Sequence, residues 1–288
     1  MNRLPHLAQR LFNTPLALHP DKAEIVMAAL ADRFGVVRLF RGDGSAASLD
    51  IVLEEEEPAP ERPSAYDQVS GVAVIPVQGT LVAKLGTLAP FSGMTGYDGV
   101  RQNFLVALED PRVEAIVLDI DSPGGEVAGC FDLADTIYKA RGSKPIWAVL
   151  SESAYSAAYA LAAAADRITV PRTGGVGSVG VIYLHADLSR ALDKEGISVT
   201  LVTYGERKAD LSEFLPLTKA AQARVQADVD TVGELFVETV ARNRGLKASA
   251  VRETEAGTFL GAGGVEIGLA DAVMAPDAAF RALLAELG

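Results

Sequence analysis

The sequence is poor in the residue types on which several common kinds of site depend. It has one cysteine, Cys130, and three histidines among 288 residues. A single cysteine excludes an intramolecular disulfide, and there is no cluster of cysteines that could hold zinc. We therefore expect neither a metal nor a cofactor. Cys130 falls on the apolar face of a predicted helix, where we expect it to be a small buried hydrophobic residue.

Positive charge and long apolar runs are also scarce. Lysine and arginine number 26 against 38 acidic residues, which gives a formal net charge of −12. Nucleic-acid binding needs clustered positive side chains, so this composition argues against it. No stretch approaches the roughly 18 apolar residues of a membrane span, and residues 1–20 lack the apolar core of a secretory signal. We expect a cytoplasmic chain with no signal peptide, transmembrane span or nucleic-acid partner.

An acidic, proline-containing run divides the chain. Residues 54–67 include EEEEPAPERP, in which like charges and proline oppose packing, and we interpret them as a linker. Residues 1–53 are predicted to form an N-terminal helical extension with a helix over residues 20–34. Residues 68–215 are predicted to form an α/β core. Residues 216–288 are predicted to be a C-terminal helical region that completes the core and makes oligomer contacts.

Apolar runs and helical periodicity alternate after the linker. Runs such as AIVLDI and IWAVL are nearly continuous, which is typical of strands buried on both faces of a sheet. Segments with apolar residues spaced three or four apart lie between them. Strands are predicted at 72–77, 115–120, 146–150, 168–170, 179–183 and 199–202, and helices at 97–108, 126–140, 156–165 and 218–242. This alternation predicts βαβ units and a mostly parallel sheet.

Three segments that follow predicted strands could carry chemistry. Ser122–Gly125 is the sequence SPGG, and its glycines would let a substrate approach the main-chain N–H groups that an oxyanion hole needs. An ordinary turn between a strand and a helix would use the same glycines. Ser156 opens a predicted helix, where it would be either a nucleophile or an N-cap. Lys208 lies in a loop, where a lysine is ordinarily a solvated charge.

A serine nucleophile needs a base to take its proton. His185 is the one histidine that follows a predicted strand, since His6 and His19 precede the linker. A lysine can replace histidine where burial lowers its pKa toward neutrality. The residues by themselves therefore leave Lys208 and His185 as alternative bases for Ser156.

Taken in order, these motifs resemble the signal peptide peptidase A family, the S49 serine peptidases. The likeness is strongest to the short, phage-type branch, which includes capsid-assembly (head-maturation) proteases. Residues 155–168, YSAAYALAAAADRI, are similar to the family's nucleophile motif, with alanine in place of its two glycines. Residues 205–210, GERKAD, are similar to its base motif, and residues 174–181, GGVGSVGV, to the stretch whose serine orients the lysine.

The resemblance implies a Clp-protease/crotonase-like α/β fold with helical N- and C-terminal appendages. It implies a serine endopeptidase that hydrolyses peptide bonds through an acyl-enzyme, using a Ser–Lys dyad. The residues that it assigns are the nucleophile Ser156, the general base Lys208, the lysine-orienting Ser178, the oxyanion-hole amides of Gly125 and Ala157, and the turn residue Gly124. It further implies a polypeptide substrate, a homo-oligomeric ring or dome, and capsid or scaffold proteins as partners at a phage procapsid.

Two other functions fit the same residues. An acyl-CoA-acting, crotonase-like enzyme would use the oxyanion donors without a lysine base. A catalytically idle capsid-assembly or scaffold module would keep the fold alone. The small residues around Ser156 also predict a cleft for small or apolar substrate side chains.

Overall fold

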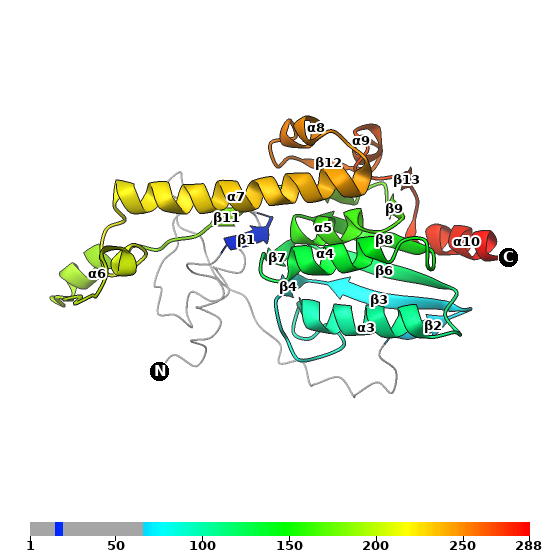
Figure 1. The fold of residues 1–288 in the computed structure, drawn as a ribbon, viewed down its shortest axis with the longest axis horizontal. Coiled ribbons are helices and arrows are strands. Elements are labelled where there is room, and N and C mark those ends of the chain that lie inside the picture. The colour runs from blue at the N-terminus through cyan, green and yellow to red at the C-terminus, as the bar shows by residue number, and fades with distance from the viewer. Residues whose placement is uncertain (1–14, 20–65) are drawn as a thin grey trace.

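The computed structural model describes residues 15–19 and 66–288 (Figure 1). The predicted helix over residues 20–34 and nearly all of the predicted linker lie outside these residues. Within the described part, no helix combines the length and the apolar character that crossing a membrane requires. The chain from residue 66 onward alternates strands and helices, as the sequence predicts.

A mostly parallel sheet forms the centre of the molecule. Its order is β12-β10-β8-β6-β3-β2, with β9 beside β8 and β13 beside β9. The strands are β2 (Asp67–Val69), β3 (Val72–Gln78), β6 (Ala115–Ser122), β8 (Ile146–Tyr155), β9 (Arg167–Val170), β10 (Gly175–Gly177), β12 (Thr258–Leu260) and β13 (Ala272–Val273). Neighbours β3, β6, β8 and β10 run parallel, whereas the edge strands β2 and β12 are antiparallel. The predicted parallel α/β core is confirmed.

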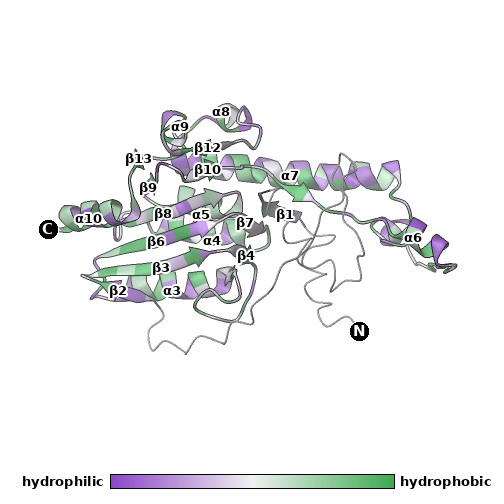
Figure 2. Ribbon diagram, turned by 180° about the vertical axis from the view of Figure 1, so that it is seen from behind, coloured by the Kyte–Doolittle hydropathy of each residue, from purple (hydrophilic) through white to green (hydrophobic). Residues whose placement is uncertain are grey.

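Helices cover both faces of this sheet. On one face lie α3 (Tyr97–Glu109), α4 (Cys130–Lys139), α5 (Ala157–Ala163) and part of the long α7 (Lys219–Arg244), packed on side chains such as Ile75 and Leu118. On the other face α10 (Pro276–Leu287) packs on the alternate side chains of the same strands, including Val117 and Trp147. The central strands are accordingly largely hydrophobic in Figure 2, because both of their faces are buried.

Helix α4 starts later than the sequence predicts. The expected helix began at residue 126, but Gly124–Glu126 forms strand β7, and α4 begins at Cys130. Gly129 separates the two, with a φ of 87° that a residue with a side chain rarely adopts. Pairing of β7 with other strands overrides the helical spacing of its side chains.

A smaller sheet lies at the carboxyl end of the main one. Its order is β11-β1-β7-β4-β5, where β1 is Pro15–Leu18, β4 is Thr80–Val82, β5 is Met94–Gly96 and β11 is Ile182–Tyr183. Strand β1 is antiparallel to both of its neighbours, β7 and β11. The sequence did not predict β1, which joins a segment before the linker to the core.

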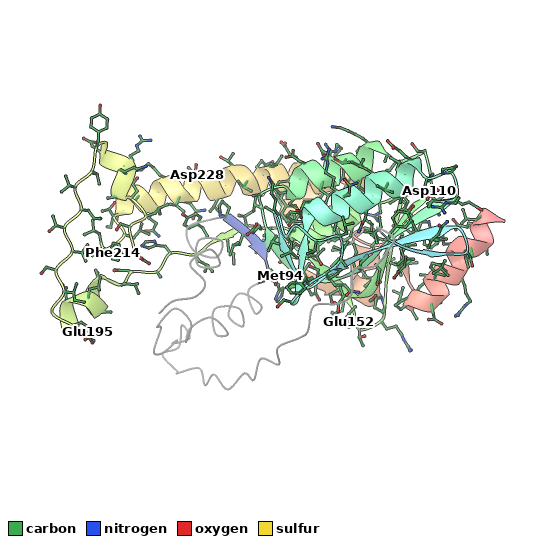
Figure 3. The ribbon with its side chains drawn as sticks, turned by 90° about the horizontal axis from the view of Figure 1, so that it is seen from below. Met94, Asp110, Glu152, Glu195, Phe214 and Asp228 are labelled. Atoms are coloured by element: carbon green, nitrogen blue, oxygen red, sulfur yellow. The ribbon has the colours of Figure 1, made fainter. Side chains whose placement is uncertain are left out.

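Residues 184–218 leave the core as an extended arm, which contains α6 (Ser189–Lys194) and a short 3-10 helix, Glu206–Ala209. Figures 1 and 3 show the arm, with Glu195 and Phe214 at its far end, projecting beyond the sheets. No residue of the arm is buried. The predicted strand at 199–202 is wrong, since this segment is exposed coil and pairs with no other strand among the described residues.

The remaining helices are α8 (Ala248–Arg252) and α9 (Gly261–Glu266), which lie between α7 and α10 in the chain. They pack near the β10–β12 edge of the main sheet, where Gly264 lies against the side chain of Val176. The segment after residue 216, which the sequence assigns to a C-terminal helical region, contains α7, α8, α9 and α10 and also supplies β12 and β13 to the main sheet.

Candidate active site

Ser156 stands at the sharp corner between β8 and α5. Its φ of 53° and ψ of −122° lie in a region that side-chain-bearing residues seldom occupy. Its main-chain N–H donates to the carbonyl of Gly177 at 2.9 Å, and its Oγ lies 3.5 Å from the carbonyl oxygen of Gly180. The residue is only 1% exposed. A strained strand-to-helix turn of this kind presents a serine hydroxyl at the edge of a sheet.

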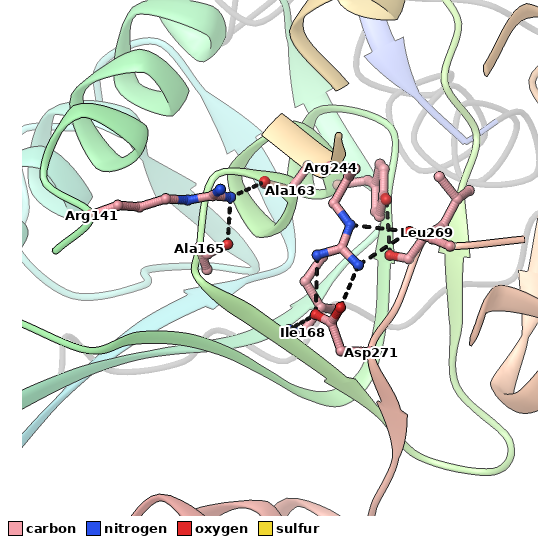
Figure 4. Close-up of polar contacts among 9 residues, drawn as sticks. Arg141, Ala163, Ala165, Ile168, Arg244, Leu269 and Asp271 are labelled. Atoms are coloured by element: carbon pink, nitrogen blue, oxygen red, sulfur yellow. Dashed lines mark hydrogen bonds and ion pairs between the residues drawn. The ribbon is translucent and has the colours of Figure 1, made fainter. Parts of the chain in front are cut away.

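The helix behind Ser156 is held rigidly at its far end. All seven residues of α5 are buried. The Arg141 guanidinium donates to three carbonyl oxygens at the end of the helix, those of Ala163, Ala164 and Ala165, at 2.8, 2.9 and 2.6 Å. Figure 4 shows the bonds to Ala163 and Ala165. These carbonyls have no partner within the helix, so the charged side chain replaces water there. The main-chain frame of Ser156 is therefore fixed from behind.

A second ionic contact supports the same region from α7. Arg244 forms an ion pair with Asp271 at 2.6 Å and donates to the carbonyl of Gly268, as Figure 4 shows for the Asp271 contact. Asp271 in turn accepts from the main-chain N–H of Ile168 at 2.7 Å. Tyr159 of α5 donates its hydroxyl to Leu269 in the same segment at 2.8 Å. The C-terminal part of the chain thus braces α5.

The structure brings Ser178 next to Ser156. Parallel pairing of Gly177 with Tyr155 places the residues that follow them side by side. Ser178 is 5% exposed, has a φ of 56°, and donates its main-chain N–H to Gly257 at 2.8 Å. The carbonyl of Gly180, close to the Ser156 hydroxyl, was missed by the sequence reasoning, because a main-chain acceptor leaves no signal in the residue type.

The SPGG turn also contacts Ser156. Gly124 has a φ of 100°, and a Cβ on it would stand 2.9 Å from the Cβ of Ser156. A Cβ on Gly125 would stand 1.9 Å from the carbonyl oxygen of Leu81. Both positions therefore require glycine. The Gly124 N–H donates to Ser122 Oγ at 3.1 Å, which fixes the turn from within.

The amide of Ala157 directly follows Ser156 in the chain. Ala157 is the first residue of α5, so its N–H has no acceptor within the helix. Cys130 of α4 contacts this end of the helix, with its Sγ 3.5 Å from the Ala157 carbonyl oxygen. The thiol is fully buried, as predicted, and burial raises its pKa to about 12. Cys130 is thus a packing residue rather than a reactive one.

Lys208 is not brought to Ser156 within the described chain. It lies in the 3-10 helix of the arm and is exposed. The neighbouring Asp210 forms an ion pair with Arg224 of α7 at 2.6 Å, which holds this part of the arm against the helix. His185, the alternative base, lies where β11 passes into the arm and is half-buried. The dyad therefore stays a prediction for this chain.

A cavity of about 480 Å³ opens beside the turn. It is lined by Gln78, Gly79, Asp121, Ser122, Pro123, Ser151, Ser153 and Tyr155. Its walls come from the carboxyl ends of β3, β6 and β8, the edge at which open α/β sheets bind ligands. Among the described residues, no group of three histidine, cysteine or acidic side chains gathers as a metal site.

Known phage proteins have sequences similar to that of this chain. The capsid assembly protease C of Escherichia phage lambda is 37% identical over 277 residues, 94% of this chain. The head-tail preconnector protein GP5 of Enterobacteria phage P21 is 40% identical over 277 residues, 93% of this chain. The chain spans 63% and 54% of the length of these two relatives.

Among solved structures, a ClpP1 mutant from Listeria monocytogenes is 12% identical, with a TM-score of 0.43 over 70% of this chain and 90% of that one. The family described as peptidase family S49 matches residues 139–287, which is more than half of the chain and includes Ser156, Ser178 and Lys208. The chain therefore belongs to peptidase family S49.

Proposed function

We propose that this protein is a serine endopeptidase in which Ser156 is the nucleophile and Lys208 the general base. The observation that carries the proposal is the corner at Ser156: a buried, positive-φ serine between a strand and a helix, in contact with a two-glycine turn. A serine that serves only as an N-cap would not require the positive φ seen here, since an N-cap residue typically has extended φ and ψ angles. Its side chain also makes no capping bond to α5.

The chemistry is acyl transfer to serine. Neutral Lys208 accepts the Ser156 proton as the oxygen attacks a peptide carbonyl, and the main-chain amides of Gly125 and Ala157 stabilise the resulting oxyanion. Each such donor contributes roughly 3–4 kcal/mol to transition-state stabilisation in measured cases. Lys208 then protonates the leaving amine, and water hydrolyses the acyl-enzyme. Ser178 is the positioning residue that holds the lysine near Ser156.

Lys208 needs a desolvated site in order to be neutral near pH 7. In one chain its side chain is in solvent, so we propose that it completes the site of a neighbouring copy. Half of the large, exposed hydrophobic side chains among the described residues lie on the arm: Leu188, Ile197, Val199, Leu201, Val202, Tyr204, Phe214 and Leu215. An exposed apolar surface of this extent is typical of a protein contact. The arm is thus suited to pack on another copy.

The partners of the proposed peptidase follow from its relatives. Because the two phage relatives are named for capsid assembly and for the head-tail preconnector, we propose capsid or scaffold polypeptides as substrates at the procapsid. The acyl-CoA alternative requires no lysine base, so dependence on Lys208 separates it from the peptidase. Dependence on His185 instead would indicate the other base.

The test is labelling by a fluorophosphonate probe together with hydrolysis of a quenched-fluorescence peptide. We expect Ser156→Ala and Lys208→Ala to lose at least a thousandfold in both signals, as when a triad member is removed. The matched control is Lys194→Ala, which removes an exposed lysine from α6 of the same arm. His185→Ala should retain activity. Full activity of the Ser156 or Lys208 variant would remove that residue from the mechanism.

A further inference from the structure

Strand β1 fills the gap between β7 and β11 in the smaller sheet. It pairs with β7 through Leu16–Glu126, Ala17–Gly125 and Leu18–Gly124. Hydrogen bonds at both ends, from His19 N to Pro123 O (2.9 Å) and from Val127 N to Pro15 O (3.4 Å), set the phase of the ladder. Bonded and non-bonded pairs alternate in an antiparallel ladder. Ala17 and Gly125 are therefore the bonded pair between them.

This pairing puts the Ala17 carbonyl at the proposed reaction centre. In a bonded pair the Ala17 oxygen accepts the N–H of Gly125, one of the two proposed oxyanion donors. The Ala17 oxygen is 2.3 Å, and the Ser156 Cβ 2.9 Å, from the point where a Cβ on Gly124 would stand. The carbonyl and the nucleophile are thus immediate neighbours.

The space between β7 and β11, which β1 fills, is called the groove from here on. The side chains of β1 fit this groove as those of a bound peptide would. Ala17 is fully buried and belongs to the main core, and Leu16, 2% exposed, packs on Ile182 and Leu184. The ring of His19 lies 5.2 Å from that of Tyr155, at the wall of the cavity beside the turn. Ala17, a small residue, thus lies beside Ser156, and the residues after it in β1 lead to His19 at the wall of the cavity.

We infer that Pro15–His19 is an internal ligand of the substrate groove, bound antiparallel to β7 and competing with peptide substrates. The inference rests on the proposed function, because it identifies the groove as the peptide-binding site of that peptidase. Adding a strand to an exposed sheet edge is a common mode of peptide recognition. A tether within the same chain gives such a strand an effective concentration of roughly millimolar order. The groove is therefore closed to other peptides until β1 leaves.

The experiment measures peptide binding rather than catalysis. A fluorescein-labelled peptide with the sequence of residues 12–22, FNTPLALHPDK, is titrated into the full-length Ser156→Ala protein and followed by fluorescence anisotropy. Two further variants in that background release β1. Leu16→Lys places a charge between Ile182 and Leu184, and Ala17→Pro removes the N–H of the bonded pair. Far-UV circular dichroism confirms that the core remains folded.

We expect the peptide to bind at least tenfold more tightly to both release variants than to the parent. If β1 occupies the groove for about nine-tenths of the time, the groove is open in about one-tenth of the molecules, and the apparent affinity for the peptide falls about tenfold. The control Val69→Lys makes the same type of change on the half-exposed edge strand β2 and should bind as the parent does. A scrambled peptide should bind none of them. Equal affinity in parent and release variants, or no binding to any, would overturn the inference.

The same design separates this inference from the proposed function. If the release variants bind the peptide more tightly but their Ser156-containing counterparts hydrolyse no peptide, the internal ligand stands and the peptidase proposal fails. If hydrolysis depends on Ser156 and Lys208 while Leu16→Lys and Ala17→Pro leave peptide affinity unchanged, the peptidase stands and the internal ligand is rejected.

Discussion

At the scale of single residues, the site depends on backbone that only glycine tolerates. Gly124→Ala should abolish peptide hydrolysis, because the new Cβ would lie 2.9 Å from the Ser156 Cβ and 2.3 Å from the Ala17 oxygen, at a φ of 100°. Gly142→Ala is the matched control: its φ is 83°, but no atom lies within 4 Å of the added Cβ. The control should cost about 1 kcal/mol of unfolding free energy, from strain alone, and keep its activity.

Hydrolysis rates and chemical denaturation of both variants measure this difference. Equal activity of the Gly124 and Gly142 variants would show that the contact with Ser156 is not needed. The sequence predicted glycine at this turn for substrate access. The structure adds that Gly124 is also required by the closeness of Ser156. Gly124 lies in β7 of the smaller sheet and Ser156 follows β8 of the main sheet, so spacing in the sequence does not predict this contact.

At the scale of elements, α5 is short and depends on contacts beyond itself. Arg141→Ala leaves the carbonyls of Ala163, Ala164 and Ala165 without their charged donor. Hydrogen bonds to a charged group contribute about 1.5–3 kcal/mol, so we expect a loss of unfolding free energy of roughly that size. Arg101→Ala, which removes an exposed arginine bonded to Thr136 at 3.3 Å, should change stability by less than about 0.5 kcal/mol.

Urea unfolding of the two arginine variants, with the wild-type protein alongside, is the measurement. The prediction fails if Arg141→Ala is no less stable than Arg101→Ala. A loss of activity larger than the loss of folded protein would further show that the far end of α5 positions Ser156.

The central strands could be predicted because each is a continuous apolar run. Such a run can be recognised in the sequence without knowing which strands pair with it. The α/β architecture predicted from the motifs is confirmed, with a mostly parallel sheet and helix α5 directly after β8. The segment at 199–202 has the same kind of composition but no strand beside it, so composition alone misled. Strand β1 was not predicted, because its four residues acquire their structure from β7 and β11, more than a hundred residues away in sequence.

At the scale of the whole molecule, the predicted site residues separate into two groups. Ser156, Ser178 and the glycine turn meet at the sheet edge, whereas Lys208 lies on an arm with no buried residue. A lysine that acts as a base needs a desolvated pocket, and the exposed arm gives Lys208 none within one chain. Either the arm folds back on its own core or it packs on another copy. The hydrophobic surface of the arm favours the second arrangement, because a single chain leaves that surface in water.

Subunit mixing decides between these arrangements. Ser156→Ala and Lys208→Ala proteins are each expected to be inactive. When they are dissociated, mixed in equal amounts and reassembled, a head-to-tail ring with sites shared between copies would contain about a quarter of its sites with both wild-type residues. Hydrolysis should therefore recover to about that fraction of the wild-type rate. Sites built within one chain would recover nothing, because every copy lacks one member of the dyad. Native mass spectrometry of the mixture establishes that mixed oligomers have formed, so that an inactive mixture counts against the shared site rather than against reassembly.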